Sequence, residues 1–279
     1  MQLGYSLTLV DAQRPDRCKS VAGFPKGVRM LKALIFDVDG TLAETERLHL
    51  LSFNAAFAET EMDWAWDDAL YRHLLSVGGS EERVRYFLDT VYTGSKTWPN
   101  SGELAADLRA RKDRHFRRLL GAGALSPRPG VSRLITEARA AGLRLGIATS
   151  ASARSLDALS QHVLPVDDWF DCVVTGDSVS RKKPAPDAYC RVMDCLGVSP
   201  AECIAFEDST AGLESAVAAG VVAIATVSEF TDGDDFSRAA VVLEHLGDPG
   251  APARVVAGDD ASSACVDLDY LRALHERTH

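Results

Sequence analysis

An apolar segment that ends in two carboxylates is the feature that most constrains the fold of this chain. Residues 31–36 are apolar except for Lys32, and Asp37 and Asp39 follow, with Gly40 directly after them. Apolar runs of this length are typical of a buried strand. Side chains two residues apart in a strand point the same way, so both carboxylates can converge at the carboxyl edge of a sheet, where open α/β folds bind ligands. Burial of two acids is costly unless a cation or a reaction requires them, and the alternative is a pair of solvated turn acids.

Three later segments also place polar or charged side chains at the ends of predicted strands or the starts of predicted helices. They are residues 147–150, which end in Thr149 and Ser150, residues 182–187, in which Lys183 precedes a Pro-x-Pro-Asp sequence, and residues 204–209, which contain Glu207 and Asp208. Taken alone, the hydroxyls can form a helix N-cap, and the acids can be stabilised by a helix dipole. The four segments in this order favour one shared function.

This ordered set of motifs resembles the haloacid dehalogenase-like phosphohydrolase superfamily, over roughly residues 32–246. Within the superfamily the chain is similar to the CbbY-like group of sugar-phosphate phosphatases. The similarity lies in residues 42–46 with His49, in residues 63–67 and in residues 78–83. Known members of that group act on xylulose 1,5-bisphosphate, and a sister group contains β-phosphoglucomutase.

Strands and helices alternate along most of the chain. The pattern predicts strands at 33–38, 143–149, 172–175, 204–206, 221–226 and 241–243, and helices at 131–140, 152–161, 187–196 and 210–219. Such alternation indicates an α/β fold with a doubly wound, Rossmann-like parallel sheet and helices on both faces. Right-handed crossovers then place the carboxyl ends of all the strands at one edge.

The segment after the first strand has helical rather than strand periodicity. We therefore expect residues 45–122 to form an inserted α-helical cap domain, between core-domain segments 30–44 and 123–250. Residues 1–29 are expected to be a disordered extension or to precede a true start at Met30. Residues 251–279 are expected to be a C-terminal extension that ends in a helix.

Composition narrows the classes of partner. The chain has 279 residues, 46% hydrophobic content and a net charge of −10, which disfavours a broad nucleic-acid or membrane surface. No apolar run approaches a membrane span, the first residues lack a secretory-signal pattern, and the six cysteines lack zinc-like spacing. We therefore expect a cytoplasmic monomer that binds a small phosphorylated sugar, without a nucleic-acid or membrane partner.

The resemblance implies separate roles for the two acids after the first strand. Asp37 is implied as the nucleophile, which forms an aspartyl-phosphate. Asp39 is implied as the group that protonates the leaving oxygen and later deprotonates water.

The resemblance also implies groups that bind the transferred phosphate. Thr149, with Ser150, would hold phosphate oxygens where a strand ends and a helix begins. The family places a lysine directly before the proline, and Lys183 is the residue at that position. Lys183 would balance the charge of the nucleophile and the phosphate. The adjacent Lys182 is expected to be a solvated surface charge.

Several negative groups cannot crowd around a phosphate dianion without a cation, and Mg²⁺ prefers oxygen ligands. Asp37 and Asp208 are the expected side-chain ligands. The resemblance implies the backbone carbonyl of Asp39 as a third, and Glu207 is either a further ligand or a group that holds one.

The core residues account for cleavage of a phosphate ester, so the cap residues must determine which phosphate ester is the substrate. Glu46 and His49 lie three residues apart and so on one helix face, and in the CbbY-like group residues here contact the sugar. A surface ion pair is the alternative for His49. Gly79 lies in a loop that enters a helix and suits polar ligand groups, and Arg83 can grip a second phosphate.

The cap also departs from the group. Glu81 and Ser80 stand where CbbY-like proteins commonly have Lys and Gly, which should weaken a site for a second phosphate. Lys112 matches another cation of the group and could partly compensate, although a solvent-facing basic helix explains it as well. The sequence therefore supports a sugar-phosphate phosphatase better than a xylulose 1,5-bisphosphate phosphatase.

Three other functions fit parts of the pattern. A phosphosugar mutase of the β-phosphoglucomutase type would keep the same acids. Haloacid dehalogenation needs no metal, and the Asp39-Gly40 and Asp208 motifs disfavour it. A non-catalytic metabolite-binding regulator would tolerate the loss of Asp37 or Asp39, and both are present.

Overall fold

The apolar segment before Asp37 forms a fully buried strand, β2 (Ala33–Phe36), near the middle of a nine-stranded sheet. The structure is a computed structural model, and it describes residues 8–9, 30–94, 98, 100–123, 125–258 and 263–279. The sheet order is β1-β4-β3-β2-β5-β6-β7-β8-β9. The other strands are β1 (Thr8–Leu9), β3 (Arg144–Ala148), β4 (Cys172–Val174), β5 (Cys203–Glu207), β6 (Val222–Thr226), β7 (Val241–Leu243), β8 (Ala253–Ala257) and β9 (Ser263–Ala264).

The strands from β1 to β7 pair in parallel, and β8 and β9 continue the sheet with antiparallel pairs. The expected doubly wound parallel sheet is therefore confirmed. Because the carboxyl ends of parallel strands share one edge, the residues that follow β2, β3 and β5 lie together.

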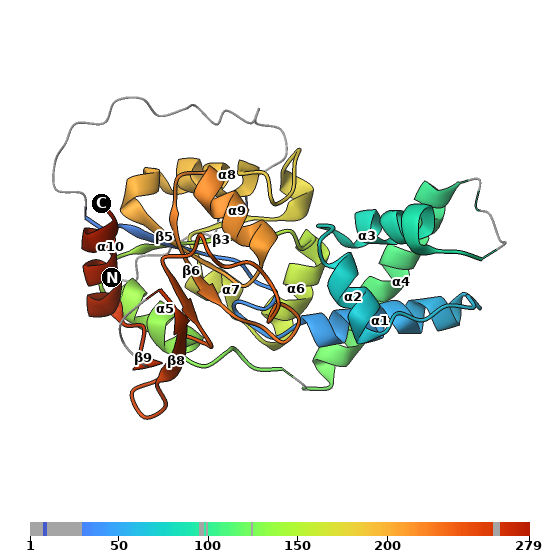
Figure 1. Ribbon diagram of the computed structural model, residues 1–279, viewed down its shortest axis with the longest axis horizontal. Helices are drawn as coiled ribbons and strands as arrows, with labels where there is room; N and C mark the ends of the chain where they lie inside the picture. The colour runs from blue at the N-terminus through green and yellow to red at the C-terminus, as the bar shows by residue number, and fades with distance from the viewer. Residues whose placement is uncertain (1–7, 10–29, 95–97, 99, 124, 259–262) are drawn as a thin grey trace.

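Helices cover both faces of the sheet (Figure 1). Alternate side chains of a strand point to opposite faces, so Ala33 and Ile35 pack in one core cluster and Leu34 and Phe36 in another. The first cluster is covered by α8 (Asp187–Leu196) and α9 (Thr210–Ala218), and the second by α5 (Val131–Ala140), α6 (Ala153–His162), α7 (Val166–Trp169) and α10 (Leu268–Thr278).

A helical cap projects from one side of the sheet domain (Figure 1). It consists of α1 (Glu46–Glu59), α2 (Asp68–Leu74), α3 (Ser80–Tyr86), the π-helix η1 (Phe87–Val91) and α4 (Ser101–Gly121). Its own core is largely aromatic, with Phe53, Phe57, Trp66 and Tyr71 buried together. No described helix is both long and apolar enough to cross a membrane.

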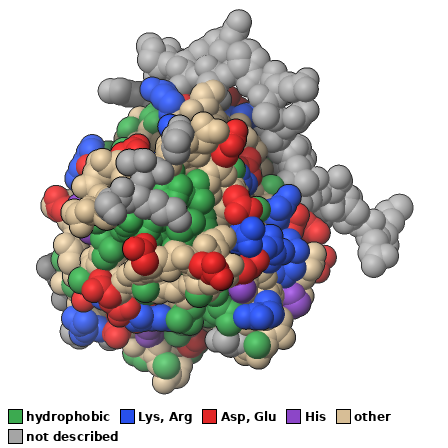
Figure 2. Space-filling view, turned by 90° about the vertical axis from the view of Figure 1, so that its right-hand side faces the viewer, with side chains coloured by type: hydrophobic (Ala, Val, Ile, Leu, Met, Phe, Trp, Pro, Cys, Tyr) green, Lys and Arg blue, Asp and Glu red, His purple; other side chains and the backbone are tan. Residues whose placement is uncertain are grey.

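Basic and acidic side chains are mixed on the face that carries the cap (Figure 2). Arg111 on α4, for example, lies 2.6 Å from Glu59 on α1 and 2.7 Å from Asp107. Pairs of this kind satisfy the charges of the cap surface.

The last part of the chain differs from expectation. Residues 251–279 were expected to lie outside the core, but β8 pairs with β7, and Val266, Leu271 and Leu274 are buried in the main core cluster. The strand pattern is weak here because β8 is mostly exposed. At the other end, Thr8–Leu9 form β1 beside β4, and the rest of the expected extension, 1–7 and 10–29, lies outside the described residues.

Candidate active site

Asp37 lies at the carboxyl end of β2, where its amide donates to Phe206 O at 3.0 Å. Its side chain is nearly buried, and Oδ1 accepts a hydrogen bond of 2.6 Å from Lys183 Nζ. Burial raises the pKa of Asp37 to about 8, although the positive charge of Lys183 opposes the shift. Lys183 therefore supplies the positive charge that favours the carboxylate form needed for nucleophilic attack.

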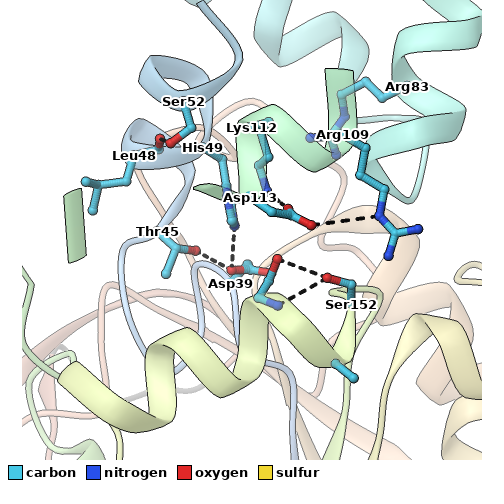
Figure 3. Close-up of polar contacts among 12 residues, drawn as sticks. Asp39, Thr45, Leu48, His49, Ser52, Arg83, Arg109, Lys112, Asp113 and Ser152 are labelled. Atoms are coloured by element: carbon cyan, nitrogen blue, oxygen red, sulfur yellow. Dashed lines mark hydrogen bonds and ion pairs between the residues drawn. The ribbon is translucent and has the colours of Figure 1, made fainter. Parts of the chain in front are cut away.

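Asp39 is oriented from the cap side. Its Oδ1 accepts from Thr45 Oγ1 at 2.5 Å and lies 3.1 Å from His49 Nε2 (Figure 3). Burial alone would raise the pKa of Asp39, but the charge of His49 and the two hydrogen bonds lower it to about 2. These contacts therefore stabilise the carboxylate form of Asp39.

His49 does not occupy the surface position that the sequence left open. The ring is 6% exposed and stacks on Phe116 with centroids 4.1 Å apart. It pairs with Asp39 rather than with Glu46. The alternative of a surface ion pair is wrong, because α1 turns this residue inward above the sheet edge.

Three buried carboxylates converge beside the nucleophile. Ligand oxygens of Asp37, Glu207 and Asp208 all lie within 4.8 Å of one another. Burial, together with the charges of Asp37 and Glu207, raises the pKa of Asp208. Gly40 allows the carboxylate of Asp208 to lie close to the backbone after β2. Its φ is +77°, and a Cβ there would lie 2.0 Å from Asp208 Oδ2.

This cluster suits a hard divalent cation. Oε1 of Glu207 accepts from Lys183 Nζ and from Tyr189 Oη, each at 2.5 Å, whereas Oε2 is buried without a partner. Asp208 Oδ2 accepts from Ser228 Oγ at 2.8 Å. A purely carboxylate donor set with one unsatisfied oxygen and excess negative charge fits Mg²⁺ better than zinc.

The end of β3 brings hydroxyls to the same edge. Thr149 is 2% exposed, and its Oγ1 accepts from the amide of Ala151 at 3.0 Å. The N-cap of α6 is Ser152, which accepts from the amide of Ser155 at 3.2 Å. Thr149 and Ser150 therefore do not have the capping role that the sequence left open for them.

A cavity of about 550 Å³ lies between the core edge and the cap. Every predicted site residue except Glu207 lines it, and Glu207 is fully buried. The cavity is large enough for a phosphorylated sugar.

Two predicted cap residues are tied into the cap itself. Glu46 Oε2 accepts from Tyr71 Oη at 2.6 Å. The guanidinium of Arg83 donates to Leu74 O and to Tyr71 Oη, each at 3.1 Å, and to Val77 O at 3.3 Å. Arg83 lines the cavity, but its donors mainly hold the cap together.

Lys112 is buried, with 2% exposure, so the explanation as a solvent-facing helix is wrong. Its Nζ lies 3.6 Å from Asp113 Oδ1 and over the rings of Phe53 and Phe116. Burial lowers the pKa of Lys112. The lysine faces the cavity, and its charge acts on Asp39.

Lys182 also differs from expectation. Its Nζ lies 2.5 Å from Glu82 Oε1, so this lysine joins the core to the cap instead of facing solvent alone. Gly79 is needed for this contact, because its φ is +97° and a Cβ there would lie 2.4 Å from Lys182 Nζ.

Several positioning residues escaped sequence reasoning. Tyr189 donates to Glu207, Ser228 to Asp208 and Thr45 to Asp39. Buried Arg128 donates to Gly40 O and to Val227 O. Only Arg128, set between two prolines, carried a local signal, since the others are ordinary residues until the fold brings them to the acids.

Comparison with known proteins places this site in a family. The model of haloacid dehalogenase-like hydrolases matches residues 31–220. The chain belongs to the haloacid dehalogenase-like hydrolases. It is 44% identical to protein CbbY of Cupriavidus necator over 252 residues, which cover 89% of this chain and 98% of that protein.

A solved structure shows the same likeness. A CbbY mutant from Rhodobacter sphaeroides in complex with xylulose 1,5-bisphosphate matches with a TM-score of 0.73 and 37% identity, over 79% of this chain and 98% of that one. β-Phosphoglucomutase of Bacillus subtilis is 29% identical over 70% of this chain and 82% of its own length. The chain is therefore a CbbY-like phosphatase, and the expected family and enzyme class are confirmed.

Proposed function

We propose that the protein is a Mg²⁺-dependent phosphatase that hydrolyses a small sugar phosphate through an aspartyl-phosphate. The observation that carries this proposal is the convergence of Asp37, Asp39, Asp208 and Lys183 at one end of a cavity that the cap closes. A nucleophile, a proton carrier and positive charge are the three things that phosphate-ester cleavage requires.

The residues have distinct parts in the reaction. Asp39 first takes up a proton, and it delivers this proton to the leaving sugar oxygen while Asp37 attacks the phosphorus. Asp39 then takes a proton from water, which attacks the aspartyl-phosphate and releases phosphate. Thr149 and Ser150 hold phosphoryl oxygens, and Lys183 balances the negative charge of Asp37 and of the phosphoryl group.

Asp37, Glu207 and Asp208, with the backbone carbonyl of Asp39, are the groups that would hold Mg²⁺. When bound there, the ion would supply positive charge beside the phosphoryl oxygens. Lys183 pairs with Asp37 and Glu207, so three acids and a substrate phosphate together require further positive charge.

The first compound to test as a substrate is xylulose 1,5-bisphosphate, because the CbbY mutant was solved with it. Glu46 and Lys112 line the cavity beyond the transferred phosphate and are the proposed sugar contacts. Gly79 and Arg83 complete this proposed binding surface.

A phosphate-release assay over a panel of sugar phosphates, with Mg²⁺ and with a chelator, tests the proposal. We expect release from at least one sugar phosphate, and its loss on chelation. If the protein binds one of the sugar phosphates but releases phosphate from none of them, the result would favour a non-catalytic regulator.

A phosphosugar mutase is the second candidate, favoured by the likeness to β-phosphoglucomutase. Both reactions begin with phosphoryl transfer to Asp37, and they differ in whether water or a sugar hydroxyl takes the group. Incubation with β-glucose 1-phosphate separates them. Hexose 6-phosphate without free phosphate would identify the mutase.

A further inference from the structure

Arg109 of α4 lines the cavity from the cap and lies among three carboxylates. Its guanidinium nitrogens are 3.5 Å from Asp177 Oδ1, 3.8 Å from Glu81 Oε2 and 3.9 Å from Asp113 Oδ2. Figure 3 shows the Arg109 side chain directed to Asp113. Glu81 and Asp177 line the cavity with Arg109, so they share its charge where a substrate would lie.

The other cations around the cavity are also engaged. Lys182 pairs with Glu82 at 2.5 Å, and Lys112 lies 3.6 Å from Asp113. Arg83 donates to two backbone carbonyls and a tyrosine hydroxyl. Among the described residues, each Lys or Arg that lines the cavity therefore already has an anionic or polar partner.

The charged side chains that line the cavity outside the transfer centre balance in number. Apart from the acids and the lysine of the transfer centre, the cavity is lined by four carboxylates, which are Glu46, Glu81, Glu82 and Asp177, and four cations, which are Arg83, Arg109, Lys112 and Lys182. A second phosphate dianion would add negative charge that nothing offsets, and it would have to displace two carboxylates from Arg109. Sugar hydroxyls, by contrast, can donate to the carboxylates and accept from the cations.

We propose that Glu81 makes this enzyme selective for sugar monophosphates, whose far end is uncharged and hydroxylated, over sugar bisphosphates. The selection rests on the proposed phosphatase function. Glu81 acts in two ways: its carboxylate repels a second phosphate, and it lies 3.8 Å from Arg109, a cation that could otherwise bind one. The side chain of Glu81 is one-third exposed, so its charge is partly screened but directed at the cavity.

The test compares two sugars that differ only in the far phosphate, xylulose 1-phosphate and xylulose 1,5-bisphosphate. In the wild type, kcat/KM for the bisphosphate should be below that for the monophosphate. Glu81→Gln should raise the ratio of kcat/KM for the bisphosphate to that for the monophosphate roughly tenfold, because it removes a costly like-charge contact. Glu81→Lys should raise this ratio further, because it puts an attracting charge in the same place. Glu103→Gln, an exposed acid on the same α4 as Arg109, is the control and should leave the ratio unchanged.

Calorimetric titration of both sugars into Asp37→Asn, with and without Glu81→Gln, repeats the comparison without turnover. If Glu81→Gln shifts the ratio of the two sugar affinities but the wild type releases no phosphate, the phosphatase function would be rejected and the selectivity retained. A wild type that prefers the bisphosphate, a ratio that Glu81→Gln leaves unchanged, or the absence of binding by either sugar would overturn the proposal. Unchanged thermal midpoints would show that the variants fold.

Discussion

Lys183 lies at the electrostatic centre of the site, with Nζ 2.6 Å from Asp37 Oδ1 and 2.5 Å from Glu207 Oε1. All three side chains are buried. Burial lowers the pKa of Lys183, but the charges of Asp37 and Glu207 outweigh this and raise it above its usual value. The lysine is therefore charged at neutral pH.

Lys183→Met should destabilise the protein, because it leaves two buried carboxylates without their partner. We expect a loss of about 3–5 kcal/mol in the free energy of unfolding without Mg²⁺, and a smaller loss with Mg²⁺, which binds only the folded site. Urea denaturation with and without Mg²⁺ measures both. Lys182→Met is the matched control, since its pair with Glu82 is partly exposed and should cost about 1 kcal/mol or less. Equal losses in the two variants would contradict this account.

Ser228→Ala should weaken Mg²⁺ binding without removing a ligand. Ser228 Oγ donates to Asp208 Oδ2 at 2.8 Å, and such partners orient a ligating carboxylate. We expect the dissociation constant for Mg²⁺, measured by calorimetry, to rise about 10- to 100-fold. Ser237→Ala, an exposed serine of the same connection, should change nothing. Unaltered affinity in Ser228→Ala would show that Asp208 is held by other contacts.

At the scale of elements, the loop after β6 joins the two domains. Phe230 belongs to the sheet domain by sequence, yet it is buried in the aromatic cluster of the cap, with its ring centroid 5.5 Å from that of Tyr71. The guanidinium carbons of Arg47 and Arg72 lie 4.8 and 5.1 Å from the same centroid. Because Tyr71 also holds Glu46, this loop relates the cap position to the cavity.

Phe230→Ala should loosen the cap from the core. We expect KM for the sugar phosphate to rise severalfold, because Tyr71 and Glu46 lose a fixed position, and amide exchange in α1 and α2 to accelerate while β2 and β5 stay protected. Hydrogen exchange with mass spectrometry measures this. Leu51→Ala, which removes an apolar side chain of α1 that is 50% exposed, is the control. Wild-type protection of α1 and α2 in Phe230→Ala would reject this role.

Most helices and strands of the sheet domain could be predicted from the periodicity of apolar residues alone. The predicted bounds of α5, α8 and β7 match the structure, and β3 is shorter than predicted by one residue at each end. These elements bury one face or both, so their apolar pattern is strong. The pattern failed at β8, whose side chains are mostly exposed, and no local pattern could place Phe230 in the cap.

At the scale of the whole molecule, the C-terminal helix closes the core at a point far from the cavity. Leu271 and Leu274 of α10 are 0% and 3% exposed and belong to the cluster that also contains Leu34 and Phe36 of β2. The stability of the site strand therefore depends on the end of the chain.

Leu271→Ala should cost about 2–5 kcal/mol in the free energy of unfolding, because it opens a cavity in this cluster. The kcat of the folded fraction should not change, because Leu271 does not line the active-site cavity. Thermal unfolding and active-site-normalised kinetics measure the two effects. Arg272→Ala, an exposed neighbour, should stay within about 0.5 kcal/mol of the wild type. Full stability in Leu271→Ala would mean that α10 is not part of the core.

The acids of the transfer centre could be predicted because each follows a strand whose pattern is visible and parallel strands share an edge, whereas Lys183 is assigned from the family resemblance. The structure brings Asp37, Asp39, Asp208 and Lys183 together as that logic requires. The far end of the cavity could not be predicted, because Arg109 and Asp177 meet only when the cap docks on the core. Their roles toward substrate stay predictions.

The most direct test of the central claim is a rapid-quench reaction with a sugar phosphate that carries a radiolabelled phosphoryl group. If Asp37 is the nucleophile, the wild type should transiently become covalently labelled in a linkage that hydroxylamine cleaves, as an acyl phosphate is cleaved, and Asp37→Asn should neither become covalently labelled nor release phosphate. Phosphate release from the wild type with no labelled protein at any time, or labelled Asp37→Asn, would contradict it.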